Sequence, residues 1–305
     1  LGEAQTLELL NFFLRNRILR PLDNDQFELT HDSIAYKLFK TNSIGVPMPN
    51  LNFENSQIPD NPFLKFQPYP EDMAAIFYGR EEEIKELFDM VVNDTEVRTT
   101  LVFGPLGVGK TSLIQAGLIP RLEQLFHVAK IHFNREFFES ALMEQMLNAD
   151  PVDDEVSLLL EAAYRWHKEK PSTEERKVVI FDQFEELFIW IDEHDCLVHF
   201  YNHMKLLLNG RWNVDLVIVV RDEFFAQLQD LEFYLPGILD EQMRVKHINH
   251  DAAKDIIRNA IDKVNIKVES DDVLERIIQT VEEEDGRVNL TYLQLYMDKL
   301  YRSVV

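Results

Sequence analysis

The chain has 305 residues, of which 46% are hydrophobic and 28% are charged. This apolar content excludes a disordered chain, and the length suits about two compact units. Lysine and arginine number 31 against 54 aspartates and glutamates, which leaves a formal net charge of −23. That balance argues against a protein surface that coats nucleic acid or an anionic membrane.

The single cysteine, Cys196, excludes a disulfide within the chain and is typical of a reducing compartment. No apolar run approaches the roughly 18 to 20 residues that a membrane-spanning helix needs. The first residues, LGEAQTLELL, contain neither an initiator methionine nor the pattern of a signal peptide. We therefore expect a soluble, cytoplasmic piece of a longer polypeptide that has no membrane partner.

Residues 1–42 have the pattern of a small separate unit. LELLNFFLRNRIL repeats its apolar residues with a helical period, FEL is strand-like, and THDSIAYKLFK begins a second helix behind the cap residue Thr30. Two helices and a short hairpin predict a winged helix. Because it lacks a basic surplus, we favour a structural, autoinhibitory role over DNA reading. Residues 43–70 include six of the twelve prolines and are predicted to be an extended linker.

The sequence from 71 to 249 alternates helical stretches with short apolar runs. The runs lie at 99–103, 128–133, 177–181, 215–220 and about 243–247. Continuous apolar strands separated by helices predict an α/β domain whose parallel sheet is covered on both faces. From 250 to 305 the apolar pattern is wholly helical, which predicts a helical domain at the end of the chain.

The clearest motif is a glycine-rich loop between the first apolar run and a helix. LVFGPLGVGKTSL matches G-x-x-x-x-G-K-[ST], the pattern of a phosphate-binding loop. The glycines let backbone N–H groups turn toward phosphate oxygens, Lys110 would reach the β- and γ-phosphates, and the Thr111 hydroxyl would bind Mg²⁺. The alternative is an ordinary glycine-rich turn with a chance lysine. The predicted cradle comprises Gly104, Pro105, Leu106, Gly107, Val108, Gly109, Lys110, Thr111 and Ser112.

A second candidate segment is KVVIFDQFEELF, in which an apolar run ends at an aspartate. Asp182 would lie at the carboxyl end of a buried strand, where α/β sheets bind ligands, and would hold Mg²⁺ through water. Glu185 or its neighbour Glu186 would orient and deprotonate an attacking water. The alternative is an acidic helix start that is favoured by the helix dipole alone.

Residue type and spacing indicate two further candidate sites. Arg221 follows the run DLVIVV, so it would meet the γ-phosphate at the same sheet edge, although strand-end arginines also pair with surface carboxylates. His199 and His203 would share one helical face with Cys196 a turn earlier, which is a candidate zinc site. Histidines four residues apart are common by chance, and we favour the chance interpretation.

Four segments, in this order and spacing, resemble the NTPase module of the STAND family, the signal-transduction ATPases with numerous domains: NPFLKFQPYPEDMAAIFYGREEEIKEL, GPLGVGKTSLIQAGLIPRL, VVIFDQFEELF and VIVVRDEFF. The resemblance covers about 61–305 and is closest to the bacterial "novel STAND" branch. It implies a five-stranded sheet of order 5-1-4-3-2, a helical lid over 250–305, ATP or ADP as ligand, slow hydrolysis and ligand-controlled oligomerisation. It also implies that Arg80 and the backbone at Asn61, Pro62 and Phe63 border the adenine.

Two features depart from the pattern of that family. Thr291 stands in the lid where a proline that touches the nucleotide is expected. The predicted winged helix normally follows the lid, whereas here it precedes the NTPase domain. Residues 1–42 are therefore either the end of an upstream module or a C-terminal piece placed first. Their His31, within THDS, resembles the histidine that holds the β-phosphate of ADP in resting switches.

The leading hypothesis is a STAND-type ATPase switch of bacterial signalling or defence. It would exchange ADP for ATP on sensing a trigger such as a foreign protein, and would then assemble with copies of itself to gather an effector encoded outside these residues. Two alternatives stay open: a constitutive P-loop ATPase or kinase, and a structural module that binds nucleotide with negligible hydrolysis. Nucleic acid is not an expected partner.

Overall fold

The computed structural model describes residues 19–21, 27–29, 46–53, 59–92, 98–138, 176–194, 197–208, 213–233, 235–283 and 285–304. The chain divides into two units, Leu1–Val46 and Pro47–Val305. In the first, strands β1 (Leu19–Pro21) and β2 (Phe27–Leu29) form an antiparallel hairpin. The helices of the predicted winged helix and His31 lie outside the described residues, so the winged helix stays a prediction.

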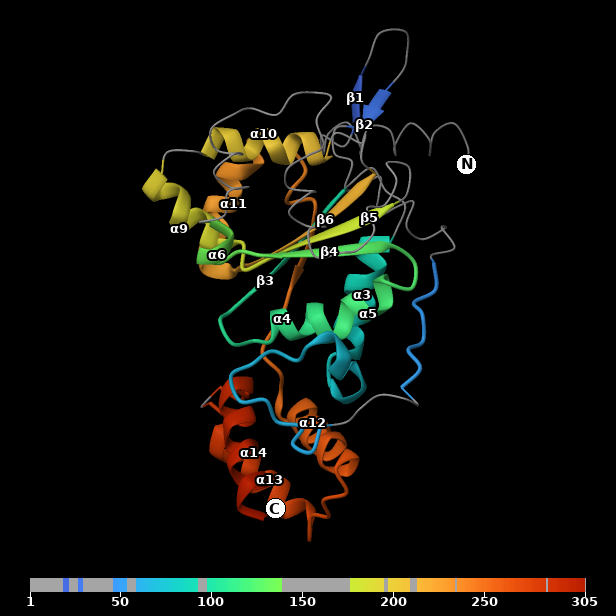
Figure 1. Ribbon diagram of the computed structural model, residues 1–305, viewed down its shortest axis with the longest axis vertical. Helices are drawn as coiled ribbons and strands as arrows, with labels where there is room; N and C mark the ends of the chain where they lie inside the picture. The colour runs from blue at the N-terminus through green and yellow to red at the C-terminus, as the bar shows by residue number, and fades with distance from the viewer. Residues whose placement is uncertain are drawn as a thin grey trace, which may run out of the picture. The chain divides into compact units, whose positions relative to one another are not determined.

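The second unit is built on a parallel five-stranded sheet (Figure 1). Its strands are β3 (Thr99–Gly104), β4 (His127–His132), β5 (Lys177–Asp182), β6 (Val214–Arg221) and β7 (Glu241–Arg244). They lie in the order β4-β5-β6-β3-β7, and every neighbouring pair is parallel. Numbered within this sheet, that order is 2-3-4-1-5, which is the predicted 5-1-4-3-2 read from the other edge.

The position of the last strand differs from the prediction of about 243–247. Strand β7 begins at Glu241, and along it buried residues alternate with exposed ones. This alternation is typical of an edge strand, and it gives a weaker signal than the continuous apolar run of a central strand. By contrast, all six residues of the central strand β5 are buried.

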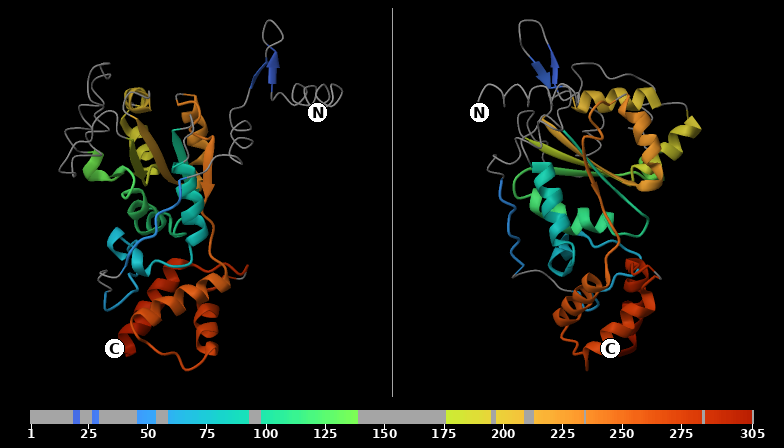
Figure 2. Two further views of the ribbon diagram at one scale, coloured as in Figure 1. Left: turned by 90° about the vertical axis from the view of Figure 1, so that its right-hand side faces the viewer. Right: turned by 180° about the vertical axis from the view of Figure 1, so that it is seen from behind.

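Helices cover both faces of the sheet (Figures 1 and 2). The core on one face includes α3 (Glu81–Val92) and the helix after the glycine-rich loop, which is divided into α4 (Lys110–Ser112), a π-helical turn η2 (Leu113–Leu118) and α5 (Ile119–Leu122). The core on the other face includes α6 (Arg135–Phe138), α9 (Glu185–His194), α10 (Leu197–Leu208) and α11 (Phe225–Glu232). Short 3₁₀ helices lie at Glu71–Ile76 (η1) and Asp222–Phe224 (η3). No helix among the described residues has both the length and the apolar character needed to cross a lipid bilayer.

Three helices form the predicted lid (Figure 2). They enclose an apolar core of their own. They are α12 (His250–Lys263), α13 (Asp271–Val281) and α14 (Leu290–Val304). The first begins where predicted because the side chain of Asn249 caps it, accepting a hydrogen bond from the backbone of Ala252 at 2.9 Å. Ile257, Ile278 and Val288 are completely buried between the helices. Burial of these apolar stripes holds the lid together.

The described second half of the proline-rich segment packs on the lid. Asn61 donates a hydrogen bond to Asp298 of α14 at 2.7 Å, and Lys65 lies 3.4 Å from the same carboxylate. Phe63 is buried in the lid core. Residues 61–65, which belong to the predicted linker, therefore hold the chain before the NTPase domain against α14 and the lid core.

His250 of α12 contacts two carboxylates of the α13 segment and so links the first two lid helices. Nε2 of His250 lies 2.6 Å from Glu275, and Nδ1 lies 3.3 Å from Glu282. A hydrogen bond that the ring donates to the Glu275 carboxylate, together with one to Glu282, raises the pKa of His250 above its usual 6.5. A raised pKa means that the stabilisation is complete below pH 6.5 and is lost as pH rises through the folded-state value.

We therefore expect the free energy of unfolding to fall between about pH 6 and about pH 8 more steeply in the native chain than in His250→Gln, which cannot titrate. Urea unfolding of both proteins at the two pH values measures this difference. Parallel pH dependence in the two proteins would show that the His250 cluster contributes nothing.

Candidate functional site

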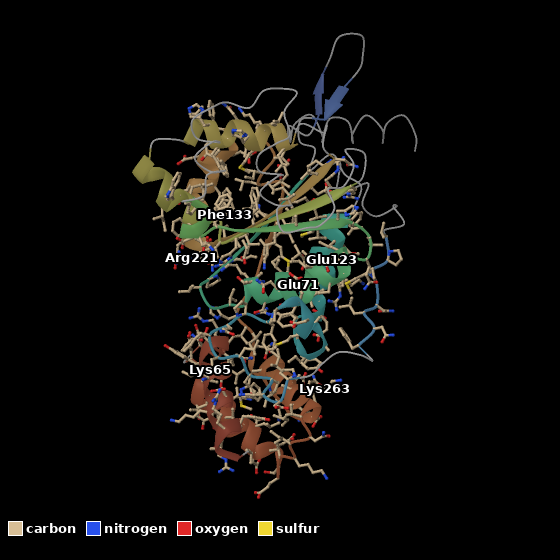
Figure 3. The ribbon with its side chains drawn as sticks, in the orientation of Figure 1. Lys65, Glu71, Glu123, Phe133, Arg221 and Lys263 are labelled. Carbon is tan, nitrogen blue, oxygen red and sulfur yellow. The ribbon has the colours of Figure 1, made fainter. Side chains whose placement is uncertain are left out.

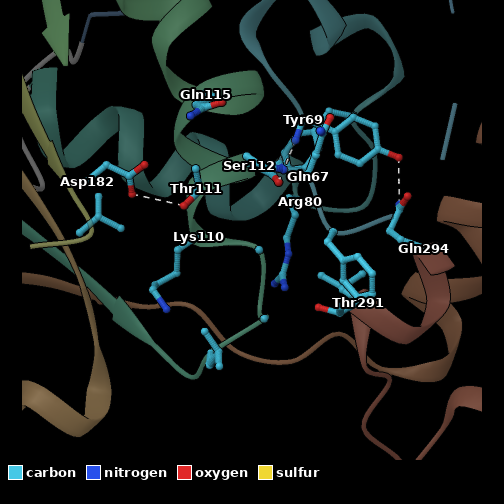
Figure 4. Close-up of a pocket in the computed structure, with 18 of the residues that line it drawn as sticks. Gln67, Tyr69, Arg80, Lys110, Thr111, Ser112, Gln115, Asp182, Thr291 and Gln294 are labelled. Carbon is cyan, nitrogen blue, oxygen red and sulfur yellow. Dashed lines mark hydrogen bonds between the residues drawn. The ribbon is translucent and has the colours of Figure 1, made fainter. Parts of the chain in front are cut away.

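A cavity of about 610 Å³ opens at the carboxyl ends of the strands (Figure 4). Its walls come from the glycine-rich loop and the helix after it, the ends of β4, β5 and β6, residues 65–69, residues 76–78, Arg80, and lid helices α12 and α14. Carboxyl ends of parallel strands are where open α/β sheets bind ligands. The cavity can hold a nucleotide, because pockets for such ligands commonly measure about 300 to 1,000 Å³.

The glycine-rich loop is shaped by close approaches that a side chain would prevent. A Cβ atom on Gly104 would lie 2.4 Å from the carbonyl oxygen of Val245, and one on Gly107 would lie 3.1 Å from the Thr291 hydroxyl. Gly107 also has a φ of 75°, in the left-handed region that favours glycine. The loop is therefore pressed between the β7 connection and the lid, and Thr291 lies against it in the place where a lid proline was expected.

Lys110 begins the helix after this loop and points into the cavity. Its ammonium group donates to the carbonyl oxygens of Gly104 and Pro105 at 2.7 and 2.9 Å. Burial lowers the pKa of Lys110, and the carboxylate of Glu185 opposes that effect. A desolvated ammonium group at a helix N-terminus is well suited to phosphate oxygens, because little water screens its charge.

Asp182 and Thr111, the two residues predicted to hold Mg²⁺, lie in contact. Thr111 donates a hydrogen bond to one carboxylate oxygen of Asp182 at 3.2 Å, and Asp182 is 1% exposed (Figure 4). The other oxygen of Asp182, Oδ2, has no hydrogen-bond partner among the described residues, and Nδ1 of His132 lies 3.5 Å away. A buried carboxylate oxygen that accepts no hydrogen bond from the described residues, beside a hydroxyl, fits Mg²⁺, which prefers oxygen ligands and keeps several waters.

A zinc site at His199, His203 and Cys196 gains no support. His203 is buried in α10, and Cys196 lies outside the described residues. Where the structure describes the chain, no group of three or more histidine, cysteine, aspartate or glutamate side chains could hold a metal ion.

The turn from β5 into α9 fixes the position of Glu185. Gln183 adopts a left-handed φ of 58°, and Phe184 is completely buried, with its ring centre 5.4 Å from that of Phe133. The backbone N–H of Phe184 also donates to Val219 on β6 at 2.9 Å. This anchored turn brings Glu185 into the cavity lining, whereas the side chain of Glu186 is 41% exposed and is not part of the lining.

Arg221, which is labelled in Figure 3, ends strand β6. Its side chain is paired with Glu185. Its Nε donates to one oxygen of Glu185 at 2.9 Å, and its backbone N–H donates to the other at 3.2 Å. Both side chains line the cavity. The structure therefore brings the predicted γ-phosphate contact together with the predicted base.

The residues expected around the adenine divide into two groups. Arg80 lines the cavity, but it is 4% exposed and donates to the carbonyl oxygens of Val108 and Lys246 at 3.0 and 2.8 Å. It thus braces the phosphate loop against the strand connection. Asn61, Pro62 and Phe63 are not part of the lining, which residues 65–69 supply instead.

The predicted phosphate cradle lies only partly on the cavity wall. Of its residues, Gly104, Pro105 and Val108 lie outside the lining.

Sequence reasoning missed a set of contacts that ties the lid to the phosphate loop. Tyr69 donates its hydroxyl to the carbonyl of Pro62 at 2.9 Å, and Gln294 of α14 donates to that hydroxyl at 2.9 Å. The backbone N–H of Tyr69 donates to Ser112 at 3.1 Å (Figure 4). Burial raises the pKa of Tyr69 to about 12, so the hydroxyl stays protonated. No local pattern in the sequence could indicate partners 43 and 225 residues away.

We expect Tyr69→Phe to lower the free energy of unfolding by about 1 to 3 kcal/mol, because the Pro62 carbonyl and the Gln294 amide both lose a buried partner. Tyr78→Phe is the matched control, because its hydroxyl makes one bond to nearby Ala75. That control should cost no more than about 1 kcal/mol. Urea unfolding compares the two variants, and equal losses would contradict the role given to Tyr69.

Comparisons with known proteins agree with this geometry. The sequence matches the family model described as Novel STAND NTPase 1 over residues 62–304. A comparison of this sequence with curated proteins found no match.

Three solved structures share the fold at low sequence identity. The Walker-type ATPase paby2304 of Pyrococcus abyssi has a TM-score of 0.51 at 14% identity, over 79% of this chain and 71% of its own. The Orc1 protein of Aeropyrum pernix, solved in complex with DNA, has a TM-score of 0.51 at 16% identity, over 80% and 65%. This chain thus spans less than two thirds of that protein. Domain III of the replication initiation protein DnaA of Thermotoga maritima has a TM-score of 0.50 at 14% identity, over 76% and 88%.

Proposed function

Because the chain belongs to the Novel STAND NTPase 1 family, we propose that it is an ATP-binding switch that hydrolyses ATP slowly and so controls the oligomerisation of an effector. The family and the P-loop fold establish a nucleotide-binding NTPase. The proposal adds ATP and ADP as the ligands, Mg²⁺ as the ion, and a trigger that sets the switch.

One observation carries the proposal. A single cavity contains the phosphate-loop lysine, the hydroxyl and carboxylate pair of Thr111 and Asp182, and the ion pair of Glu185 with Arg221. These are the groups that phosphoryl transfer to water requires: a phosphate cradle, a metal site, a base, and a cation for the γ-phosphate.

Each group has one role in the proposed reaction. Lys110 binds the β- and γ-phosphates, and Arg221 binds the γ-phosphate. Thr111 and Asp182 hold Mg²⁺, which would neutralise charge on the β- and γ-phosphate oxygens. Glu185 accepts a proton from water as the water oxygen bonds to the γ-phosphorus and the bond from that phosphorus to the bridging oxygen breaks. The products are ADP and inorganic phosphate, and Glu185 then returns the proton to solvent.

The switching part of the proposal rests on the lid. Thr291 lies against the phosphate loop, and Gln294 is linked through Tyr69 to Ser112, so nucleotide and lid contact the same loop. ATP favours assembly with further copies, while ADP favours the resting state, in which His31 is proposed to hold the β-phosphate. The trigger is a molecule such as a foreign protein, and the effector lies outside residues 1–305. We propose no nucleic-acid partner, given the net charge of −23.

Light scattering of the protein with Mg²⁺ and either ADP or a non-hydrolysable ATP analogue tests the switch. We expect a larger mass with the ATP analogue once the trigger is present, and a monomer with ADP. If the mass is the same with both nucleotides in the presence of the trigger, the chain binds nucleotide but nucleotide does not control its assembly.

We expect Arg221→Ala to weaken ATP binding by about 10- to 100-fold, because a charged hydrogen bond contributes about 1.5 to 3 kcal/mol. ADP affinity should stay nearly constant, since ADP has no γ-phosphate. Calorimetry with ADP and a non-hydrolysable ATP analogue compares the two affinities. Equal losses for both nucleotides would indicate that Arg221 only supports the structure.

A further inference from the structure

The ion pair between Glu185 and Arg221 engages both functional groups at once. Glu185 is 5% exposed, and each of its carboxylate oxygens accepts a hydrogen bond from Arg221, one from Nε and one from the backbone N–H. A general base needs a free oxygen lone pair directed at the water that it deprotonates. In this pairing both carboxylate oxygens of Glu185 face Arg221 at the end of β6 and not an attacking water.

The rest of the guanidinium group is also surrounded by groups of this chain. Its Nη2 atom lies 3.8 Å from Glu186 and its Nη1 atom lies 3.9 Å from Glu223, while the ring centre of Phe224 is 5.2 Å from its central carbon. Three carboxylates therefore compete with any incoming phosphate for one positive charge. Of these, Glu185 is the most buried and is the carboxylate that hydrogen-bonds to Arg221.

We propose that Glu185 and the γ-phosphate of ATP compete for Arg221, so that arrival of the γ-phosphate releases the base. This inference rests on the proposed function. When Arg221 turns toward the γ-phosphate, Glu185 loses the Nε hydrogen bond and its charge partner, and one carboxylate oxygen becomes available to water. ADP offers no γ-phosphate, so the pair stays closed. The base is thus freed only when there is a bond to hydrolyse.

The competition reduces the preference of the site for ATP. Part of the favourable interaction between Arg221 and the γ-phosphate is offset by the loss of the Glu185 interaction, so the native chain should prefer ATP over ADP by less than an unpaired Arg221 would allow. Neutralising Glu185 should remove this offset. A variant that damages the base is therefore expected to bind ATP better, and only if Arg221 is present to receive the γ-phosphate.

Calorimetry with ADP and a non-hydrolysable ATP analogue, both with Mg²⁺, tests the competition through a double-mutant cycle. We expect Glu185→Gln to raise the ratio of ATP-analogue affinity to ADP affinity by about tenfold, the difference between a charged and a neutral hydrogen bond. In the Arg221→Ala background the same change should raise the ratio by less than about twofold. Glu186→Gln removes an equal charge at 3.8 Å and serves as the control, with less than about threefold effect.

The outcomes separate this inference from the proposed function. A native chain that binds neither nucleotide would refute both. If it binds both nucleotides, an unchanged ratio in Glu185→Gln, or an equal rise with and without Arg221, would refute the competition alone. If Arg221→Ala fails to fold, Arg221→Gln replaces it in the double-mutant cycle. Glutamine removes the charge but keeps a long polar side chain at the strand end.

Discussion

Lys110→Ala is expected to abolish nucleotide binding. The ammonium group lies at the N-terminus of the helix that follows the phosphate loop, and its present partners, two loop carbonyls, are weaker acceptors than phosphate oxygens. Two charged hydrogen bonds of about 1.5 to 3 kcal/mol each correspond to a loss of more than about 100-fold in affinity. Calorimetry with ATP and with ADP measures the loss.

Lys130→Ala is the matched control for this substitution. Lys130 lines the same cavity from strand β4 and is not part of the phosphate loop. Its removal takes the same charge from the cavity and is expected to weaken binding by less than about tenfold. If the two alanine variants lose equal affinity, the cavity attracts nucleotide through its overall charge, and the phosphate-loop assignment is wrong.

Glu185→Gln is expected to slow ATP hydrolysis by about 100-fold or more while nucleotide still binds. Loss of a positioned general base typically costs about 10² to 10⁴ in rate. Glutamine fills the same volume, so the anchored turn at Phe184 should keep its shape. Phosphate release under saturating ATP measures the rate.

Glu186→Gln is the control, because its side chain is 41% exposed and does not line the cavity. Its rate should stay within about threefold of that of the native chain. A larger loss in Glu186→Gln than in Glu185→Gln would identify Glu186 as the base. No loss in either variant would indicate a ligand pocket that does not use a glutamate for catalysis.

The sequence predicted the parts of the fold that depend on short-range patterns. The buried strands are recognisable as apolar runs because both of their faces are covered, and the phosphate loop combines fixed spacing with a required strand before it and helix after it. Asp182 was predicted at a strand end, and the structure adds its contact with Thr111. The helical lid begins at His250, where the pattern changes to a helical period.

Contacts between distant residues were the parts that sequence could not predict. Tyr69 looked like one residue of a proline-rich linker, although it connects α14 to the phosphate loop. The pairing of Glu185 with Arg221 joins two separately predicted roles. The predicted sheet order already puts β5 beside β6, but nothing in the sequence indicated that these two side chains bond to each other. Asn61, Pro62 and Phe63 were assigned to the adenine by resemblance, whereas the structure uses Asn61 and Phe63 against the lid.

Phosphate release from ATP, measured with Mg²⁺ and again after chelation, is the most direct test of the central claim that this cavity is an ATP-hydrolysing switch site. We predict slow release that requires Mg²⁺ and falls to background in Lys110→Ala. Release that equals the Lys110→Ala background under both conditions would contradict the claim and would leave a chain that binds nucleotide without hydrolysing it.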